Sequence, residues 1–333
     1  MTHLQPRRAR SGIMSNSSQV LADISEFADN VGFGHPNVAA IQSSVNHTLK
    51  ELASSEGEIA ARLSQAISHG LLSPGKRARA VLTLSVVQDL GKDPSLALRP
   101  ACAIEMLHTA SLIVDDLPCM DNAHMRRGQP TTHVQFGEDT AILAAMTLLC
   151  ESFAAVSGAV ELDAQCRAEI ASKLAAGAGV KGIAGGQLMD LHYSEDATTT
   201  SDVEQIYQLK TGALFASAAW IGGRVARTSE AQLKTLDAFG MTLGVAFQAY
   251  DDLADQLAGM SHAGKDVNAD SLKSTVISTE GLDGATHLAN RRFAEALDLL
   301  SEIGLEGGIV ATFVNDLRDR LIARHQNDST SKA

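Results

Sequence analysis

The sequence predicts an all-α protein that folds as a single domain. From about Pro36 onward, apolar residues recur with the 3.6-residue period of helices, and no stretch alternates convincingly as a strand does. The composition agrees, because 45% of the residues are apolar and only 4% are aromatic, with Ala and Leu prominent. No Pro- or Ser-rich linker divides the 333 residues, so one helical domain is preferred over two.

We expect the folded domain to span residues 31–325. The segment 1–30 holds several serines and three arginines but no apolar core resembling a secretory signal, and it is predicted to be a disordered tail. A transit peptide is the alternative for this segment, and Met14 is an alternative start. Residues 326–333 are predicted to be a polar, frayed tail.

Charge and cysteine content narrow the class of protein. The net charge of −12 does not support nucleic-acid binding, so an anionic ligand must meet local positive charge or a metal. The four cysteines form no Cys-x-x-Cys pair, which favours reduced thiols and a cytoplasmic location. No transmembrane segment is predicted, because the best apolar run, 141–150, stops at Glu151.

The first candidate site residues follow two predicted amphipathic helices, 38–53 and 57–69. The loop Ser73-Pro74-Gly75 delivers basic side chains to the start of a helix over 80–90; these are Lys76, Arg77 and Arg79. A helix N-terminus favours anions through its dipole and its free amides. The cluster is therefore interpreted as half of a phosphate site, although a solvated basic turn fits it equally well.

An acidic cluster ends the next predicted helix. That helix places Asp115 and Asp116 at its C-terminus, and Pro118 disfavours its continuation, so Asp121 can turn back toward Asp115. Three acids at the negative end of a helix repel one another and require positive charge. Oxygen ligands without His or Cys point to a hard cation, with Mg²⁺ the best fit.

Two arginines follow this cluster directly. Arg126 and Arg127 suit forked hydrogen bonds to phosphate oxygens. An acidic turn followed by a solvated basic pair is the alternative. It is less favoured because a second acidic cluster occurs downstream.

The middle of the chain continues as helices over 139–160 and 163–182. Gln187 and Asp190 then share a helical face, which by itself suggests a buried hydrogen-bonded pair more than a site. Lys210-Thr211-Gly212 interrupts a further helix, which resumes over 213–221.

The second acidic cluster lies on a helix predicted over 236–257. Asp251 and Asp255 stack one turn apart with Asp252 beside them, and Gln248 precedes them by one turn. Like charges at this spacing repel, so the cluster is interpreted as a second Mg²⁺ platform. In the polar loop that follows, Lys265 is predicted to reach a phosphate as part of a mobile lid.

Six motifs in this order resemble the trans-isoprenyl diphosphate synthases, and among them the bacterial geranylgeranyl diphosphate synthases associated with carotenoid formation. They are GKRAR (75–79), HTASLIVDDLPCMDNAHMRRGQPTTH (108–133), GGQLMDL (185–191), KTG (210–212), FQAYDDLAD (247–255) and GKDVNADSLKST (264–275). The resemblance covers roughly residues 36–321. It implies an all-α bundle of antiparallel helices around a deep central cavity, and a homodimer.

The resemblance also implies roles for individual residues. The resemblance implies three Mg²⁺ ions, whose ligands are matched here by Asp115, Asp121 and Asp251, assisted by Asp116, Asp252 and Asp255. The allylic diphosphate would be held by Arg126, Lys210 and Lys265. Isopentenyl diphosphate would be held by Lys76, Arg79, His108 and Arg127. The reacting carbons would be lined by Thr211 and Gln248, with Gln187 and Asp190 nearby.

Product length is expected to depend on side chains just upstream of the first acidic cluster. In the family a bulky residue there blocks the growing tail, whereas this chain has Ala110 and Ser111. The resemblance therefore implies a C20 product, with a farnesyl or longer-chain synthase as the alternative. Ala123 and His124 stand where many relatives carry further acids, so an auxiliary metal contact is not expected there.

Two other readings are less favoured. A class I terpene cyclase has no second diphosphate to bind, which argues against it because this chain keeps Lys76, Arg79 and Arg127. A non-catalytic partner subunit of a prenyl synthase could lose acidic or basic groups, and this chain has kept both sets.

Overall fold

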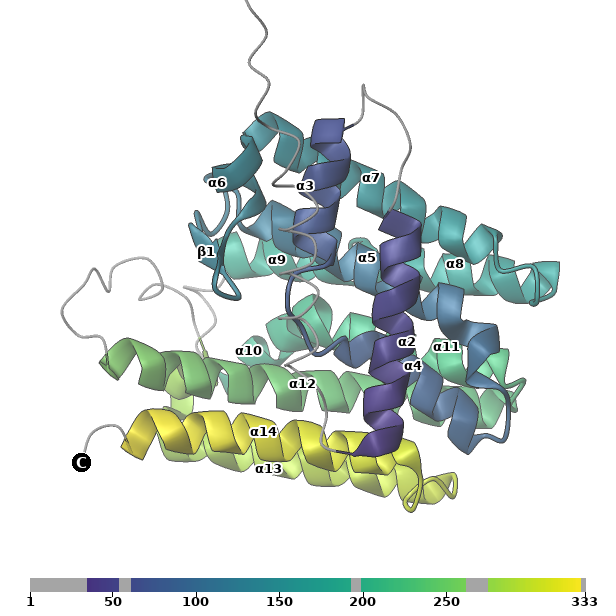
Figure 1. Cartoon of the computed structure of the whole chain (residues 1–333). Coiled ribbons are helices and arrows are strands. Elements are labelled where there is room, and N and C mark those ends of the chain that lie inside the picture. Colours follow the sequence, from purple (N-terminus) through teal and green to yellow (C-terminus); the bar gives the residue numbers. More distant parts are fainter. Residues whose placement is uncertain (1–34, 54–60, 193–198, 262–274, 331–333) are drawn as a thin grey trace, which may run out of the picture.

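The computed structural model describes residues 35–53, 61–192, 199–261 and 275–330 (Figure 1). In these ranges the chain is helical apart from turns and one short hairpin, which confirms the all-α prediction. Lys265 and the expected N-terminal tail, 1–30, lie outside the described residues, as does the side chain of Asp255.

The elements follow one another along the chain with short connections. They are α2 (Pro36–Ala53), α3 (Ala61–Leu71), α4 (Ala78–Asp89), the 3₁₀-helix η2 (Pro94–Ala97), α5 (Leu98–Asp115), β1 (Met125–Arg126), β2 (Gln129–Pro130), α6 (Thr132–Phe136), α7 (Glu138–Ser157), α8 (Ala164–Ala178), α9 (Ile183–His192), α10 (Thr200–Tyr207), the π-helical turn η4 (Gln208–Gly212), α11 (Ala213–Val225), α12 (Glu230–Ser261), α13 (Val276–Glu302) and α14 (Ile309–Thr330). The two strands pair antiparallel, with Arg126 opposite Gln129.

Three helices form the centre of the bundle because they are apolar on nearly every side. In α4 and α11 almost all residues are buried, and α5 is buried along most of its length. α4 packs against both α5 and α11. The long helix α12 contacts α11 on one side and α13 and α14 on the other, so these last two helices close the bundle (Figure 1).

Several helix ends lie where the sequence places them. α5 ends at Asp115, three residues before Pro118. The predicted interruption at Lys210-Thr211-Gly212 is a π-helical turn that passes directly into α11. Single π turns inside helices occur frequently at functional sites. The segment 163–182, predicted as one helix, is instead helical only to Ala178 and resumes as α9.

Helix length differs from the sequence predictions in two respects. Two helical stretches, Pro94–Asp115 and Glu138–Ser157, are long and apolar enough to cross a membrane, so the expectation that no run has sufficient length was wrong on that count. The first is 67% buried and is a core helix of the bundle, whereas the second is only 44% buried. At the other end of the chain, α14 continues to Thr330, into the segment expected to be a polar tail.

Candidate active site

The first acidic cluster lies in a tight turn that closes the C-terminus of α5. The Asp121 amide donates to the Asp115 carbonyl at 2.9 Å, and the Ala123 amide donates to the Asp116 carbonyl at 3.2 Å. These bonds satisfy carbonyls that the end of a helix leaves without partners. Asp121 therefore turns back toward Asp115, as predicted from Pro118.

Burial and crowding make this cluster electrostatically unfavourable by itself. Burial raises the pKa of Asp115 to about 6, and the neighbouring Asp121 adds to that rise while Lys210 opposes it. Burial also raises the pKa of Asp116, although Arg126 opposes the shift. A carboxyl whose charged form is disfavoured in this way is stabilised by any cation that binds beside it.

Arg126 does not point into open space in this structure. Its Nε and one terminal nitrogen both lie 2.7 Å from the same oxygen of Asp116. Lys210 is likewise paired, because its Nζ donates to Asp190 Oδ2 at 2.6 Å. Two of the expected phosphate ligands are thus held by carboxylates of the same site.

The basic cluster at the start of α4 is more buried than a solvated turn. Arg79 is only 7% exposed, its guanidinium lies 4.6 Å from the ring centroid of Phe215, and its Nε has no hydrogen-bond partner. Burial lowers its pKa to about 10. The same effect lowers the pKa of Arg127 to about 10. Arg79 is a buried cation whose pKa is lowered further by the charge of the more exposed Arg127, and such a pair favours an anionic ligand.

The loop before α4 is shaped to receive Arg127. Arg127 has a left-handed backbone, with φ of 53°, and donates weakly to Ser73 Oγ at 3.4 Å. A Cβ at Gly75 would lie 2.5 Å from a terminal nitrogen of Arg127, so only glycine fits there without displacing the guanidinium. The loop precedes the first acidic cluster in the sequence and Arg127 follows it. The fold therefore brings together two segments that the cluster separates along the chain.

Two residues organise this cluster in a way that sequence reasoning did not foresee: Arg77, which it assigned to the phosphate site, and Glu105, which it did not consider. Arg77 turns away into the fold, where it donates to Asn46 Oδ1 and to the Ser73 carbonyl, each at 2.9 Å. Glu105, a buried carboxylate in the middle of α5, accepts the Ala80 amide at 3.1 Å. The interpretation as a phosphate site assumed that the amides at the start of α4 are free for a ligand. The Ala80 amide is not, because it already donates to Glu105.

His108 lies among the arginines of the basic cluster. Burial lowers its pKa well below the usual value, and the positive charges of Arg79 and Arg127 lower it further. The imidazole is therefore neutral at pH 7 and acts as a hydrogen-bonding group, not as a third cation.

One carboxylate of the second acidic cluster interacts electrostatically with the basic cluster. Asp251 is close enough to Arg79 and Arg127 to raise the pKa of both against the effect of burial. Next to it, Asp252 Oδ1 accepts from Gln248 Nε2 at 2.8 Å, and Gln248 Oε1 accepts from Thr211 Oγ1 at 2.6 Å. The three predicted residues are thus joined in one hydrogen-bonded row from η4 to α12.

Gln187 and Asp190 are not the hydrogen-bonded pair that their spacing suggested. Asp190 pairs with Lys210, whereas both amide atoms of Gln187 are buried without a partner. Asp190 reaches Lys210 because the backbones of α9 and η4 lie close together. A Cβ at Gly186 would lie 2.4 Å from the Lys210 backbone nitrogen, so glycine lets α9 lie directly against η4. An unsatisfied buried amide beside this pair is a group suited to a ligand.

The donor set fits a hard cation, but no ready-made metal cage is present. In the described ranges, no three His, Cys, Asp or Glu side chains lie close enough together to hold one ion. Asp115 and Asp121 are nevertheless close enough for each charge to affect the other, at the negative end of α5. Carboxylates of this kind bind Mg²⁺ one or two at a time, with phosphate and water completing the shell.

The residues expected to set product length lie in the last turns of α5. Ala110 is buried, and Ser111 is partly buried with its hydroxyl donating to the His108 carbonyl at 2.8 Å. On this part of α5, Thr109, Ile113 and Asp116 line a small cavity of about 30 Å³ together with His69 and Arg126.

Comparison with known proteins agrees with this site. The polyprenyl synthetase family model matches residues 60–297. A geranylgeranyl diphosphate synthase from Pseudescherichia vulneris is 39% identical over 256 residues, which is 76% of this chain and 82% of that protein. A farnesyl diphosphate synthase from Bacillus subtilis is 36% identical over 248 residues, which is 73% of this chain and 84% of that protein.

The fold has solved counterparts as well. The crystal structure of a Helicobacter pylori geranyltransferase complexed with magnesium and isoprenyl diphosphate superposes with a TM-score of 0.75 at 29% identity, covering 88% of this chain and 99% of that one. The relatives divide between C15 and C20 synthases, and they share the reaction class. With paired acidic clusters facing a buried basic cluster in an all-helical bundle, this chain belongs to the polyprenyl synthetase family and is a prenyl diphosphate synthase.

Proposed function

We propose that the protein catalyses the Mg²⁺-dependent head-to-tail condensation of isopentenyl diphosphate with an allylic diphosphate, releasing pyrophosphate and giving geranylgeranyl diphosphate. One observation carries the proposal above all. The charge of Asp251 in the second acidic cluster raises the pKa of Arg79 and Arg127 in the basic cluster, so the two clusters are near enough to interact and would hold a metal-bound diphosphate and a second diphosphate in one site.

The acidic residues of the site would bind the metal, and the basic residues would bind diphosphate. Asp115, Asp121 and Asp251, assisted by Asp116, Asp252 and Asp255, would hold Mg²⁺, three ions by family resemblance. Bound Mg²⁺ would stabilise the negative charge that develops on departing pyrophosphate. Lys210, Arg126 and Lys265 would hold the same diphosphate, which requires Lys210 and Arg126 to leave Asp190 and Asp116 or to bind both partners.

The neighbouring subsite would bind isopentenyl diphosphate. The buried Arg79 and the more exposed Arg127 are cations that would gain an anionic partner there, and neutral His108 can donate a hydrogen bond without adding charge. Lys76 belongs to the same predicted subsite. The oxygens of Thr211 and Gln248 would face the allylic carbons and stabilise positive charge on them.

The C20 product rests on Ala110 and Ser111. Both are small, and Ala110 is buried in α5 where a bulky side chain would occupy the path of a growing tail. Farnesyl diphosphate is the alternative product, since farnesyl diphosphate synthases are among the similar proteins.

We also propose that the protein is a homodimer through α7. This helix exposes a row of large apolar side chains at helical spacing, namely Ile142, Leu143, Met146 and Leu149. They lie opposite its buried face, which packs on α5. A second copy burying this row would remove from water an apolar surface that water solvates poorly. A cytoplasmic location is part of the same proposal, in keeping with four cysteines that form no disulfide.

The test is to incubate the purified protein with Mg²⁺, isopentenyl diphosphate and, separately, dimethylallyl, geranyl and farnesyl diphosphates, and to determine product masses. A C20 end product supports the full proposal. A C15 end product keeps the chemistry and overturns the account of Ala110. No condensation with any primer would favour a non-catalytic partner subunit.

A further inference from the structure

A chain of hydrogen bonds links the start of α13 to the reacting end of the site. The Val276 amide donates to the Tyr207 hydroxyl at 3.2 Å, and that hydroxyl donates to Asp252 Oδ2. From Asp252 the chain continues through Gln248 to Thr211 by the bonds of 2.8 and 2.6 Å already described. Four helical elements, α13, α10, α12 and η4, thus meet through one connected row of polar groups.

Tyr207 is the member of this row to which neither the sequence motifs nor the charge pattern assigns a role. It is the last residue of α10, only 5% exposed, and its ring lies in the apolar core. Its hydroxyl is the group that accepts from α13 while donating to α12. Because Gln248 already donates to the other carboxylate oxygen, both oxygens of Asp252 are fixed by donors of the chain itself.

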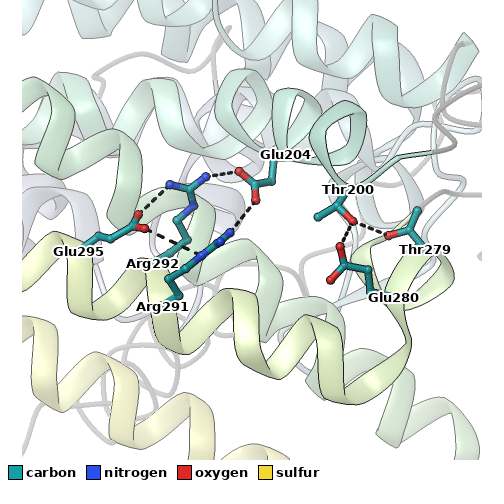
Figure 2. Close-up of polar contacts among 7 residues, drawn as sticks. All are labelled: Thr200, Glu204, Thr279, Glu280, Arg291, Arg292 and Glu295. Atoms are coloured by element: carbon teal, nitrogen blue, oxygen red, sulfur yellow. Dashed lines mark hydrogen bonds and ion pairs between the residues drawn. The ribbon is translucent and has the colours of Figure 1, made fainter.

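A set of polar contacts, here called the polar clamp, joins α10 to α13 (Figure 2). Near the start of α10, Thr200 Oγ1 donates to Glu280 and lies 3.4 Å from Thr279 Oγ1. One turn on, Glu204 pairs with Arg292 and lies 3.6 Å from Arg291. Residues 200, 204 and 207 share one face of a helix, so α10 meets α13 at three points along that face.

The clamp is itself braced on the α13 side. Arg292 donates to Glu295 at 2.7 Å, and α13 begins with a capping box in which Thr275 and Ser278 satisfy each other's amides. The first turn of α13 is therefore fixed both by its own cap and by Tyr207. A rotation of α10 relative to α13 would break the clamp and the Tyr207 bonds together.

We propose that Tyr207 is a positioning residue that holds Asp252, and through Gln248 also Thr211, in register with the start of α13. The inference rests on the proposed function in so far as Asp252 assists Mg²⁺ binding. A carboxylate beside a metal is oriented by the donors that hold it, and loss of such a donor commonly weakens metal affinity or activity 10- to 100-fold. Tyr207 and Gln248 each donate to one carboxylate oxygen of Asp252, so together they fix the orientation of that carboxylate.

The test compares two variants that each delete one buried tyrosine hydroxyl. Tyr207→Phe keeps the ring in the core and removes the bonds to Asp252 and Val276. Tyr250→Phe is the matched control, because Tyr250 is 2% exposed and its hydroxyl donates from α12 to Asn290 of α13 at 2.7 Å, outside the row. Both variants should lose similar stability in thermal denaturation.

Three measurements on the full chain separate positioning from packing. In calorimetric titrations with inorganic pyrophosphate and Mg²⁺, Tyr207→Phe should raise the Mg²⁺ concentration needed for half-saturation about tenfold, and Tyr250→Phe should leave it unchanged. In turnover assays Tyr207→Phe should lower kcat about tenfold with little change in the KM for isopentenyl diphosphate. In hydrogen exchange the Val276 amide should exchange faster only in Tyr207→Phe.

The possible outcomes are distinct. Equal Mg²⁺ dependence in the two variants overturns the proposal and leaves Tyr207 a packing residue. If the wild type binds Mg²⁺ and pyrophosphate in a Tyr207-dependent way yet condenses no primer, the proposed function fails and the positioning role stands. If the wild type neither binds nor turns over, both fail.

Discussion

Glu105 and Ala80 join the two central helices at the point where the basic cluster begins. The carboxylate of Glu105, in the middle of α5, accepts the Ala80 amide at 3.1 Å, and Glu105 is only 4% exposed. Its charge also opposes the lowering of the pKa of Arg77, Arg79 and Arg127 by burial. One buried carboxylate thus holds the first turn of α4 and balances three guanidiniums, of which those of Arg77 and Arg79 are buried.

Replacing Glu105→Gln should separate these two roles. The amide keeps an acceptor oxygen for Ala80 but removes the negative charge near the buried cations Arg77 and Arg79, so we expect the free energy of unfolding to fall by about 2 kcal/mol. The same change should tighten the binding of inorganic pyrophosphate, because the cluster becomes more positive. Urea denaturation and calorimetry measure the two effects. Exposed Glu302→Gln is the control, and equal stability of the two variants would refute the role as counter-charge.

Replacing Asp115→Asn should abolish turnover while stabilising the protein without metal. Burial and Asp121 raise the pKa of Asp115 to about 6, so the charged form costs stability at pH 7. We expect a gain on the order of 1 to 3 kcal/mol at pH 7 in chelator-treated protein, measured by urea denaturation. Unchanged turnover would remove Asp115 from the metal site.

The raised pKa of Asp115 also predicts how the free energy of unfolding changes with pH. Between the unfolded pKa, about 3.8, and the folded value, about 6, the native state binds more protons than the unfolded state. The contribution of Asp115 to stability is therefore fully present below pH 4 and is lost as pH rises to about 6. The difference in unfolding free energy between wild type and Asp115→Asn, measured from pH 4 to 7 without metal, should grow with pH and then level off.

His108 should give stability the opposite pH dependence. Its pKa is lowered in the fold by burial and by the arginines, so the unfolded state binds more protons below pH 6.5. Stability from this residue is lost as pH falls through that value. Compared with wild type, His108→Gln should therefore lose less stability between pH 7 and pH 5.5 in thermal denaturation. A greater loss in the variant would mean that His108 is charged in the native protein.

Replacing Ala110→Phe should shorten the product. The benzyl group adds a large apolar volume to a buried position five residues before Asp115. With geranyl diphosphate as primer, we expect the end product to move from C20 to C15 while consumption of the primer stays within about threefold of wild type, and farnesyl diphosphate, which is already C15, should no longer be extended. Product masses decide the matter, and unchanged C20 output would show that the tail takes another path.

The apolar row on α7 predicts an oligomer. Met146→Glu places a charge on a side chain that is 58% exposed in the single chain, so the folded monomer should tolerate it while a dimer burying that face should not. Sedimentation should show wild-type dimers and mutant monomers at micromolar concentration. Val180→Glu is the control, because Val180 is 84% exposed and belongs to the connection between α8 and α9, not to α7. Wild-type monomers would contradict the proposed homodimer.

Much of the site was already contained in local sequence. Helical periodicity determined the fold class, because period depends only on which residues face inward. Pro118 determined that α5 stops and that Asp121 turns back, since proline excludes helix at the preceding residue. The spacing of Gln248, Asp251 and Asp252 placed them on neighbouring positions of one helix without reference to any other element.

Tertiary structure alone decided which of these groups meet. Glu105 and Arg77 carry no local mark of their roles, because a buried counter-charge and an inward-turned arginine depend on helices distant in the chain. Tyr207 looks like an ordinary apolar helix residue until α13 and α12 bring Val276 and Asp252 to its hydroxyl. Charge and hydrogen bonds act over a few ångströms of space, whereas a sequence specifies distance only along the chain.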